Sequence, residues 1–96
     1  TPQVLIILDG FGYRTETSHN AIAQAHPVNV TQWINEYPHA ILSASGSAVG
    51  LLPHMIGNSE VGHLTIGSGR RVRQPVAEIS HQIDTGTFFT DKVLVK

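Results

Sequence analysis

The sequence predicts an α/β fold with a mostly parallel sheet, and three stretches of the chain carry this prediction. Residues 4–8, "VLIIL", form an uninterrupted apolar run, which is typical of a strand that helices cover on both faces. Residues 28–37 place apolar side chains along one helical stripe, and residues 39–46, "HAILSASG", have the composition of a second strand. A strand, helices and a further strand in this order predict a right-handed crossover within one sheet.

The first strand is expected to lead into a loop rather than a hairpin. Asp9-Gly10 between apolar residues would favour a tight hairpin turn, which is the alternative. Residues 11–20, however, show no second alternating strand with which residues 4–8 could pair. We therefore expect a buried parallel strand that ends at Asp9.

The helices of the first half are bounded by cap residues and prolines. Ser18 or Asn20 can cap a short helix at residues 21–26, which stops at Pro27. The helix at residues 28–37 ends before a second proline. Its apolar stripe consists of Val30, Trp33, Ile34 and Tyr37.

The second half begins with a glycine-containing loop at residues 47–59. A short helix at residues 59–66 and another at residues 76–84, ended by Gly86, are expected to follow. Residues 88–96 begin an element that the chain does not finish.

Length and composition limit the classes of protein to which the chain can belong. A chain of 96 residues makes at most one small domain, and 41% hydrophobic with 14% charged residues indicates a globular one. The net charge of −1 gives no case for binding nucleic acid or an acidic membrane, and the basic cluster Arg70, Arg71 and Arg73 is typical of a solvated face. No apolar stretch is long enough for a membrane span, and no signal peptide is expected. The lack of cysteine excludes disulfides and thiolate metal sites and fits a cytoplasmic location.

Asp9 is the first candidate for chemistry. It lies at the carboxyl end of the first predicted strand, where open α/β sheets bind ligands. Gly10 and Gly12 leave space beside it, and a carboxylate is a hard oxygen ligand suited to Mg²⁺ or Mn²⁺. The alternative, which position alone does not exclude, is a turn aspartate that accepts local backbone hydrogen bonds.

Ser59 is the second candidate, in the motif "GNSEVGH" at residues 57–63. It follows Asn58 where a loop meets a helix, and the free N–H groups there favour an anion such as a serine alkoxide or a phosphoryl group. The Asn58 amide can donate to a phosphate oxygen. The alternative is an ordinary helix start in which Ser59 or Asn58 is the N-cap.

His63 lies one helical turn beyond Ser59 on the same face. It can orient the serine, act as a base, or be a structural histidine that supports the helix. The other five histidines have no metal-ligand spacing and receive no role.

Four segments of the chain carry a family resemblance: "LIILDGFGYR", "HNAIAQA", "SASGSAVGLLPHMIGNSEVGHLTIGSGR" and "FF". They resemble the N-terminal part of the cofactor-independent phosphoglycerate mutases, which are two-metal enzymes of the alkaline phosphatase superfamily. The resemblance covers residues 4–71 and extends more loosely to Phe89. It implies an alkaline-phosphatase-like three-layer fold that is incomplete in this chain. It also implies that residues 1–75 begin the metal-binding domain and that residues 76–96 are a linker and the start of an inserted transferase domain.

The resemblance implies roles for two residues. Ser59 would take the phosphoryl group from 3-phosphoglycerate, forming a phosphoserine, and return it to give 2-phosphoglycerate without added bisphosphoglycerate. Asp9 and Ser59 would be ligands of one of two Mn²⁺ ions, for which Mg²⁺ is an alternative. The remaining metal ligands and most substrate-binding arginines lie in later parts of the family's chains, so the C-terminal part is an expected partner.

Two further functions remain open at this point. One is a metal-dependent phosphomonoesterase of the same superfamily, in which water takes the phosphoryl group. The other is a truncated, catalytically incomplete chain or an assembly partner for a chain that carries the other ligands. Because a sheet buried on both faces needs elements that this chain lacks, we also expect exposed apolar patches on the isolated chain.

Overall fold

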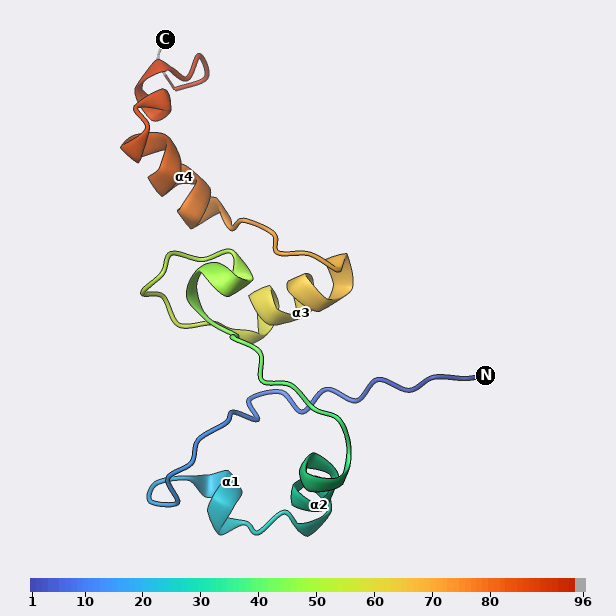
Figure 1. The fold of residues 1–96 in the computed structure, drawn as a ribbon. Helices are drawn as coiled ribbons and strands as arrows, with labels where there is room; N and C mark the ends of the chain where they lie inside the picture. Colours follow the sequence, from blue (N-terminus) through green and yellow to red (C-terminus); the bar gives the residue numbers. More distant parts are fainter. Residues whose placement is uncertain (95–96) are drawn as a thin grey trace. The chain divides into compact units, whose positions relative to one another are not determined.

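The computed structural model describes residues 1–94 of the chain. The chain divides into two units, Thr1–Leu42 and Ser43–Lys96, and each is described here by itself. Figure 1 shows α1 and α2 in the first unit and α3 and α4 in the second. This division follows contacts within the chain and does not test the expected domain assignment of residues 1–75 and 76–96, which stays a prediction.

The first unit contains the short helix α1 (Ala21–Gln24), and Asn20 is its N-cap. The Oδ1 atom of Asn20 accepts a hydrogen bond from the backbone N–H of Ala23 at 3.1 Å. Its Nδ2 atom donates to the carbonyl oxygens of Glu16 at 2.9 Å and Arg14 at 3.3 Å. One asparagine side chain therefore closes the preceding loop and starts the helix, which confirms one of the two expected caps.

The boundaries of α2 (Val28–Glu36) follow its prolines, as expected. His26, with a φ of 49°, ends the preceding turn in the left-handed region, and Pro27 occupies the N-cap of α2. The helix stops before Pro38, which has no N–H to continue it. Three members of its predicted apolar stripe, Trp33, Ile34 and Tyr37, are exposed.

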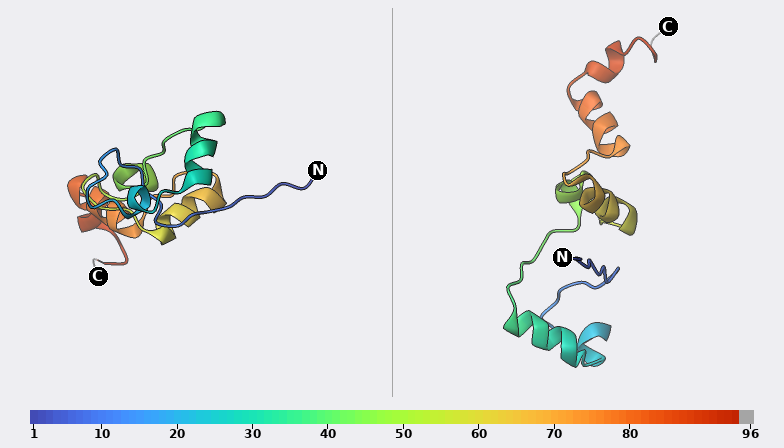
Figure 2. Two further views of the ribbon diagram at one scale, coloured as in Figure 1. Left: turned by 90° about the horizontal axis from the view of Figure 1, so that it is seen from below. Right: turned by 90° about the vertical axis from the view of Figure 1, so that its right-hand side faces the viewer.

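The predicted sheet is not confirmed, because residues 1–94 contain no strand. The apolar run at residues 4–8 is drawn as an extended trace without a strand arrow (Figures 1 and 2), and Val4 is 83% exposed. The second predicted strand, residues 39–46, is likewise irregular as far as residue 45, Gly46 begins a 3₁₀-helix, and Leu42 is 84% exposed. A strand exists only when a neighbour takes its backbone hydrogen bonds, and the described part of the chain supplies none. The expectation of exposed apolar surface is confirmed.

The second unit holds the buried core of the described residues, which is small. The buried side chains are Val49, Leu51 and Val61, and the partly buried Met55 packs against them. The core joins the 3₁₀-helix η1 (Gly46–Val49) to α3 (Ser59–Ser68). The sequence predicted only a loop at residues 47–59, so η1 is a feature that the composition did not indicate.

Backbone hydrogen bonds close the loop around this core. The N–H of Gly46 donates to the carbonyl of Met55 at 2.9 Å, and the N–H of Leu51 donates to the carbonyl of Gly46 at 3.0 Å. The N–H of Gln74 donates to the carbonyl of Gly50 at 2.8 Å, which ties the segment after α3 to the end of η1. Gly50 has a φ of 81°, and an added Cβ would overlap the Val72 carbonyl, so only glycine fits there.

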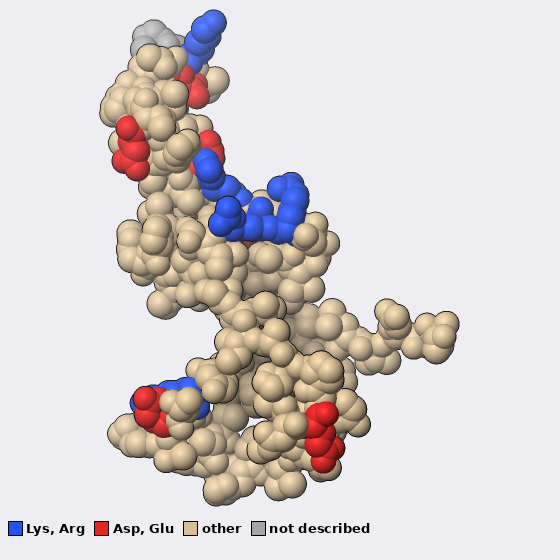
Figure 3. Space-filling model, viewed as in Figure 1, with Lys and Arg blue, Asp and Glu red and all other residues tan. Residues whose placement is uncertain are grey.

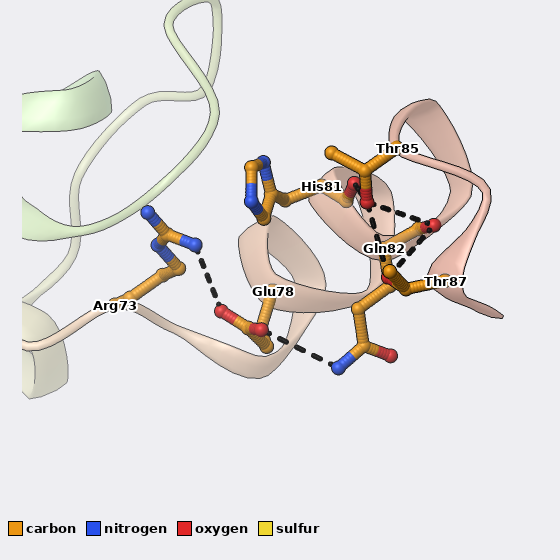
Figure 4. Close-up of polar contacts among 6 residues, drawn as sticks. All are labelled: Arg73, Glu78, His81, Gln82, Thr85 and Thr87. Atoms are coloured by element: carbon orange, nitrogen blue, oxygen red, sulfur yellow. Dashed lines mark hydrogen bonds and ion pairs between the residues drawn. The ribbon is translucent and has the colours of Figure 1, made fainter. Parts of the chain in front are cut away.

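The helix α4 (Pro75–Asp84) begins with a proline, whose fixed φ suits the first helical turn. Its C-terminus is bounded by Thr85, whose Oγ1 donates to the His81 carbonyl at 2.8 Å (Figure 4). The 3₁₀-helix η2 (Thr87–Thr90) follows. In it, the rings of Phe88 and Phe89 pack edge to face, with 5.7 Å between their centroids. The expected helix at residues 76–84 is thereby confirmed to within one residue.

An exposed ion pair joins Arg73, of the basic cluster, to Glu78 of α4, and it yields a first prediction (Figure 4). The guanidinium of Arg73 donates to Oε2 of Glu78 at 3.0 Å, and this bond lowers the pKa of the Glu78 carboxyl below its ordinary value. Stability from the pair is therefore present above the unfolded-state pKa of Glu78 and is lost as the pH falls through the lower, folded-state pKa. Arg73→Gln is expected to raise the pKa of Glu78 towards its ordinary value in an NMR titration of the carboxyl carbon.

Arg70→Gln is the matched control, because it removes a neighbouring positive charge without removing the hydrogen bond to Glu78. The pKa of Glu78 should change less in this variant than in Arg73→Gln. Equal shifts in the two variants would show that general charge, rather than the hydrogen bond, sets the pKa.

Candidate functional site

The candidate site is built on the first turn of α3, and Asn58 is the N-cap of that helix. Asn58 has an extended backbone, and its Oδ1 accepts a hydrogen bond from the N–H of Val61 at 3.0 Å. The cap interpretation is thus correct for Asn58, and Ser59 is the first helical residue rather than the cap. Since Oδ1 is engaged by the helix, Nδ2 is the atom of Asn58 that would donate to a bound anion.

This position gives Ser59 the electrostatic environment that the sequence indicated. The first N–H groups of a helix have no intrahelical acceptor and carry the positive end of its dipole. Ser59 begins a helix of ten residues, and its side chain is exposed at that end. The start of the helix therefore stabilises a negative charge that forms on Ser59 Oγ, typically by about 0.3–1 kcal/mol at an exposed site.

Ser59 and His63 lie one turn apart on α3 and are in contact, as the spacing predicted. The Nδ1 atom of His63 is 3.2 Å from Ser59 Oγ and 2.8 Å from the Ser59 carbonyl oxygen. The structure thus brings Asn58, Ser59 and His63 together within the first five helical positions and the cap.

Two contacts hold the first turn of α3 in place. Val61 is only 3% exposed, within the core that it shares with Val49 and Leu51. Gly57, directly before the cap, lies so close to the backbone of Ala44 that a Cβ built on it would overlap the Ala44 carbonyl oxygen. The glycine of the motif is therefore needed for this close approach of two backbone segments.

Gly57→Ala tests this packing. The added methyl group must displace the backbone at Ala44 or at the start of α3, so we expect a loss of about 1–3 kcal/mol in the free energy of unfolding. Gly67→Ala is the matched control, because Gly67 lies within α3 and a Cβ there meets nothing within 4 Å. That change should stabilise the helix by about 0.5–1 kcal/mol. Denaturant unfolding of both variants measures the difference, and equal effects would refute the close approach.

Asp9 lies in the first unit, at the turn that ends the apolar run. The N–H of Phe11 donates to the Leu8 carbonyl at 3.1 Å, which closes a β-turn, and Gly10 has a φ of 75° there. The backbone around Asp9 thus forms a turn, and this turn does not conflict with a ligand role for the side chain. Because Asp9 and Ser59 belong to different units, a shared site for them is a proposal.

The donor chemistry fits a divalent cation only as part of a larger site. Asp9 offers a carboxylate, and Ser59 offers a hydroxyl that becomes a good ligand when it is deprotonated. Among residues 1–94, however, no three His, Asp or Glu side chains are grouped in a way that could hold a metal ion. The described residues therefore offer oxygen atoms of suitable chemistry but no complete metal site.

One arginine of the basic cluster Arg70, Arg71 and Arg73 makes a structural contact that the sequence did not predict. Figure 3 shows positive side chains gathered on the segment that joins α3 to α4. Arg71 donates from Nη1 to the carbonyl oxygen of Ser47 at 3.1 Å, so it ties this segment to η1. Its partner is distant in sequence, and no local pattern indicated the contact. The solvated-face interpretation is right about exposure, because Arg70, Arg71 and Arg73 are all exposed.

None of the helices described for residues 1–94 combines the length and the apolar character that crossing a membrane requires.

The geometry thus gives a nucleophile candidate, Ser59, at a capped helix start, and a carboxylate suited to a hard metal ion, Asp9, in the other unit. The chain belongs to the Metalloenzyme superfamily, whose family model matches residues 1–92. Its curated relatives include three bacterial proteins named 2,3-bisphosphoglycerate-independent phosphoglycerate mutase. Those of Hydrogenovibrio crunogenus and Clostridium perfringens are each 50% identical to the chain over 95 residues. That of Thermosynechococcus vestitus is 52% identical over 96 residues.

These matches take in 99% of this chain but only 18% or 19% of each relative. The family resemblance noted from the sequence is thereby confirmed. The chain spans about a fifth of the length of the curated relatives that it matches.

Proposed function

We propose that this chain is the nucleophile-bearing N-terminal part of a cofactor-independent phosphoglycerate mutase, an isomerase of glycolysis and gluconeogenesis. The observation that carries the proposal is the place of Ser59, at the positive end of α3 directly after its asparagine cap. The 50% identity to mutases named for this activity supports it. A cytoplasmic location is part of the proposal, because glycolysis supplies the substrate there.

Ser59 carries the transferred group in the proposed reaction. Its Oγ attacks the phosphorus of 3-phosphoglycerate, so an Oγ–P bond forms while the bond from phosphorus to the 3-oxygen of the glycerate breaks. The 2-hydroxyl of the same glycerate then attacks the phosphoserine. This second step releases 2-phosphoglycerate and regenerates Ser59, so no bisphosphoglycerate is consumed.

The start of α3 is suited to the phosphoryl group in both steps. The group is anionic throughout, and it would lie where the first helical N–H groups point. Nδ2 of Asn58 would donate to one of its oxygens, since Oδ1 is already held by the N–H of Val61. Gly57 and the buried Val61 keep this turn in place, so the donors are positioned before the substrate arrives.

Asp9 and Ser59 are the proposed ligands to one of two Mn²⁺ ions, with Mg²⁺ as the alternative. Such ions, when bound, lower the pKa of the serine hydroxyl and neutralise charge on the phosphoryl oxygens. The chain supplies one carboxylate and one serine oxygen, whereas two ions need several more ligands. We therefore propose that the remaining ligands, and the groups that hold the glycerate, come from the C-terminal part, and that this chain alone has no turnover.

This proposal is tested on the chain joined to the C-terminal part that the relatives carry beyond the matched region, which we call the complete enzyme. With Mn²⁺ and without bisphosphoglycerate, it should convert 3-phosphoglycerate to 2-phosphoglycerate, and the chain alone should not. Release of free phosphate in place of 2-phosphoglycerate would identify the alternative, a metal-dependent phosphomonoesterase. Absence of both products would refute the proposal.

A further inference from the structure

We propose that His63 is a positioning residue that donates a hydrogen bond from Nδ1 to Ser59, and that it is not the base that deprotonates this serine. The inference rests on the function proposed above, in which Ser59 Oγ is the nucleophile. Spacing alone allowed either role for His63. The atoms that it contacts distinguish the two.

The proton on Nδ1 follows from the shorter of the two contacts. Nδ1 of His63 lies 2.8 Å from the carbonyl oxygen of Ser59, a distance typical of a good hydrogen bond. A carbonyl oxygen can only accept, so Nδ1 must carry the hydrogen. The charged ring and the Nδ1–H tautomer of the neutral ring both meet this requirement, whereas the Nε2–H tautomer does not.

The longer contact then has a fixed direction. Nδ1 is 3.2 Å from Ser59 Oγ, and a nitrogen that already carries a hydrogen cannot accept the hydroxyl proton. His63 therefore donates to Oγ, sharing one N–H between the two oxygens of Ser59. The hydroxyl hydrogen of Ser59 is therefore not donated to Nδ1 of His63.

This arrangement has two consequences for the proposed reaction. The bond to the Ser59 carbonyl fixes the ring one helical turn from the nucleophile, so the N–H remains beside Oγ when negative charge develops there. The charge on Oγ strengthens this bond, so the interaction favours the reacting state over the resting state. His63 should accordingly affect kcat more than KM.

Two variants of similar size separate a donor at Nδ1 from other roles. In H63N the amide nitrogen lies two bonds from Cβ, the same place as Nδ1, whereas in H63Q it lies one bond further out. In the complete enzyme, H63N should keep kcat within about 3-fold of the unchanged protein, and H63Q should lower it by about 10- to 100-fold with KM little changed. Equal losses in the two variants, or full activity in both, would overturn the proposal.

A measurement independent of turnover locates the proton directly. NMR of the complete enzyme with ¹⁵N-labelled histidine, recorded without metal, should show His63 protonated on Nδ1. A neutral ring protonated only on Nε2 would overturn the proposal, whatever the kinetics. If the unchanged enzyme has no mutase activity, the function proposed above fails, and the NMR result still decides which atom of His63 donates to Ser59.

Discussion

Ser59→Ala is expected to lower the mutase activity of the complete enzyme by a factor on the order of 10⁴ or more. The variant loses the only atom proposed to bond covalently to the phosphoryl group, and neither the Asn58 cap nor the helix dipole can substitute for it. Because the N-cap is Asn58 and not Ser59, the helix should begin at the same residue in the variant. Initial rates of 2-phosphoglycerate formation measure the loss.

Ser68→Ala is the matched control, since it removes a serine hydroxyl from the other end of the same helix. Ser68 Oγ donates to the Arg70 carbonyl at 2.8 Å, so its loss should affect only the local end of α3. Activity in this variant should stay near that of the unchanged enzyme. Residual activity of Ser59→Ala within about 10-fold of the unchanged enzyme would exclude a phosphoserine mechanism.

Asp9→Asn is expected to raise the metal concentration needed for half-maximal activity by at least about 100-fold. Removing groups that merely support a ligand commonly costs 10–100-fold in metal affinity, and Asp9 is proposed as a ligand itself. The amide retains the size of the carboxylate and removes its charge, so the β-turn closed by Phe11 and Leu8 should persist. Titration of activity with Mn²⁺, and then with Mg²⁺, measures the change.

Asp84→Asn removes an exposed carboxylate from the last residue of α4 and serves as the control for a general loss of charge. Its metal requirement should equal that of the unchanged enzyme. The same metal requirement in Asp9→Asn and Asp84→Asn would remove Asp9 from the ligand set.

The helices could be predicted from the sequence because their boundary signals are local. Asn20 and Asn58 each accept a hydrogen bond from an N–H three residues ahead, within a distance that any helix start provides. Pro27 and Pro38 limit α2 on both sides through their own backbone geometry. None of these effects needs a distant part of the chain.

The sheet could not be judged in the same way, because a strand depends on partners. Residues 4–8 have the composition of a buried strand, yet they are exposed in a chain whose described residues offer no neighbouring strand. The apolar run indicates a surface that another part of the protein must cover. The chain spans only 18% of one relative, so that relative is about five times as long. The proposed C-terminal part would supply the strands that pair with this run.

For the candidate site too, the sequence predicted the local contacts and missed those between residues distant in sequence. The contact between Ser59 and His63 follows from helical spacing, but the direction of their hydrogen bond needed the position of the Ser59 carbonyl oxygen. The close approach of Gly57 to Ala44, and the bond from Arg71 to Ser47, join residues distant in sequence and gave no local signal. The sequence thus indicated the candidate reactive groups, whereas the structure shows the contacts that hold Ser59 and its helix in place.

The most direct test of a phosphoserine at residue 59 is to trap it. The complete enzyme would be mixed with Mn²⁺ and 3-phosphoglycerate labelled in its phosphoryl group, quenched in acid within one turnover, digested, and examined by mass spectrometry. Our account predicts one labelled peptide, phosphorylated at Ser59, and no requirement for bisphosphoglycerate. A label on another residue, or turnover without any labelled enzyme, would contradict it.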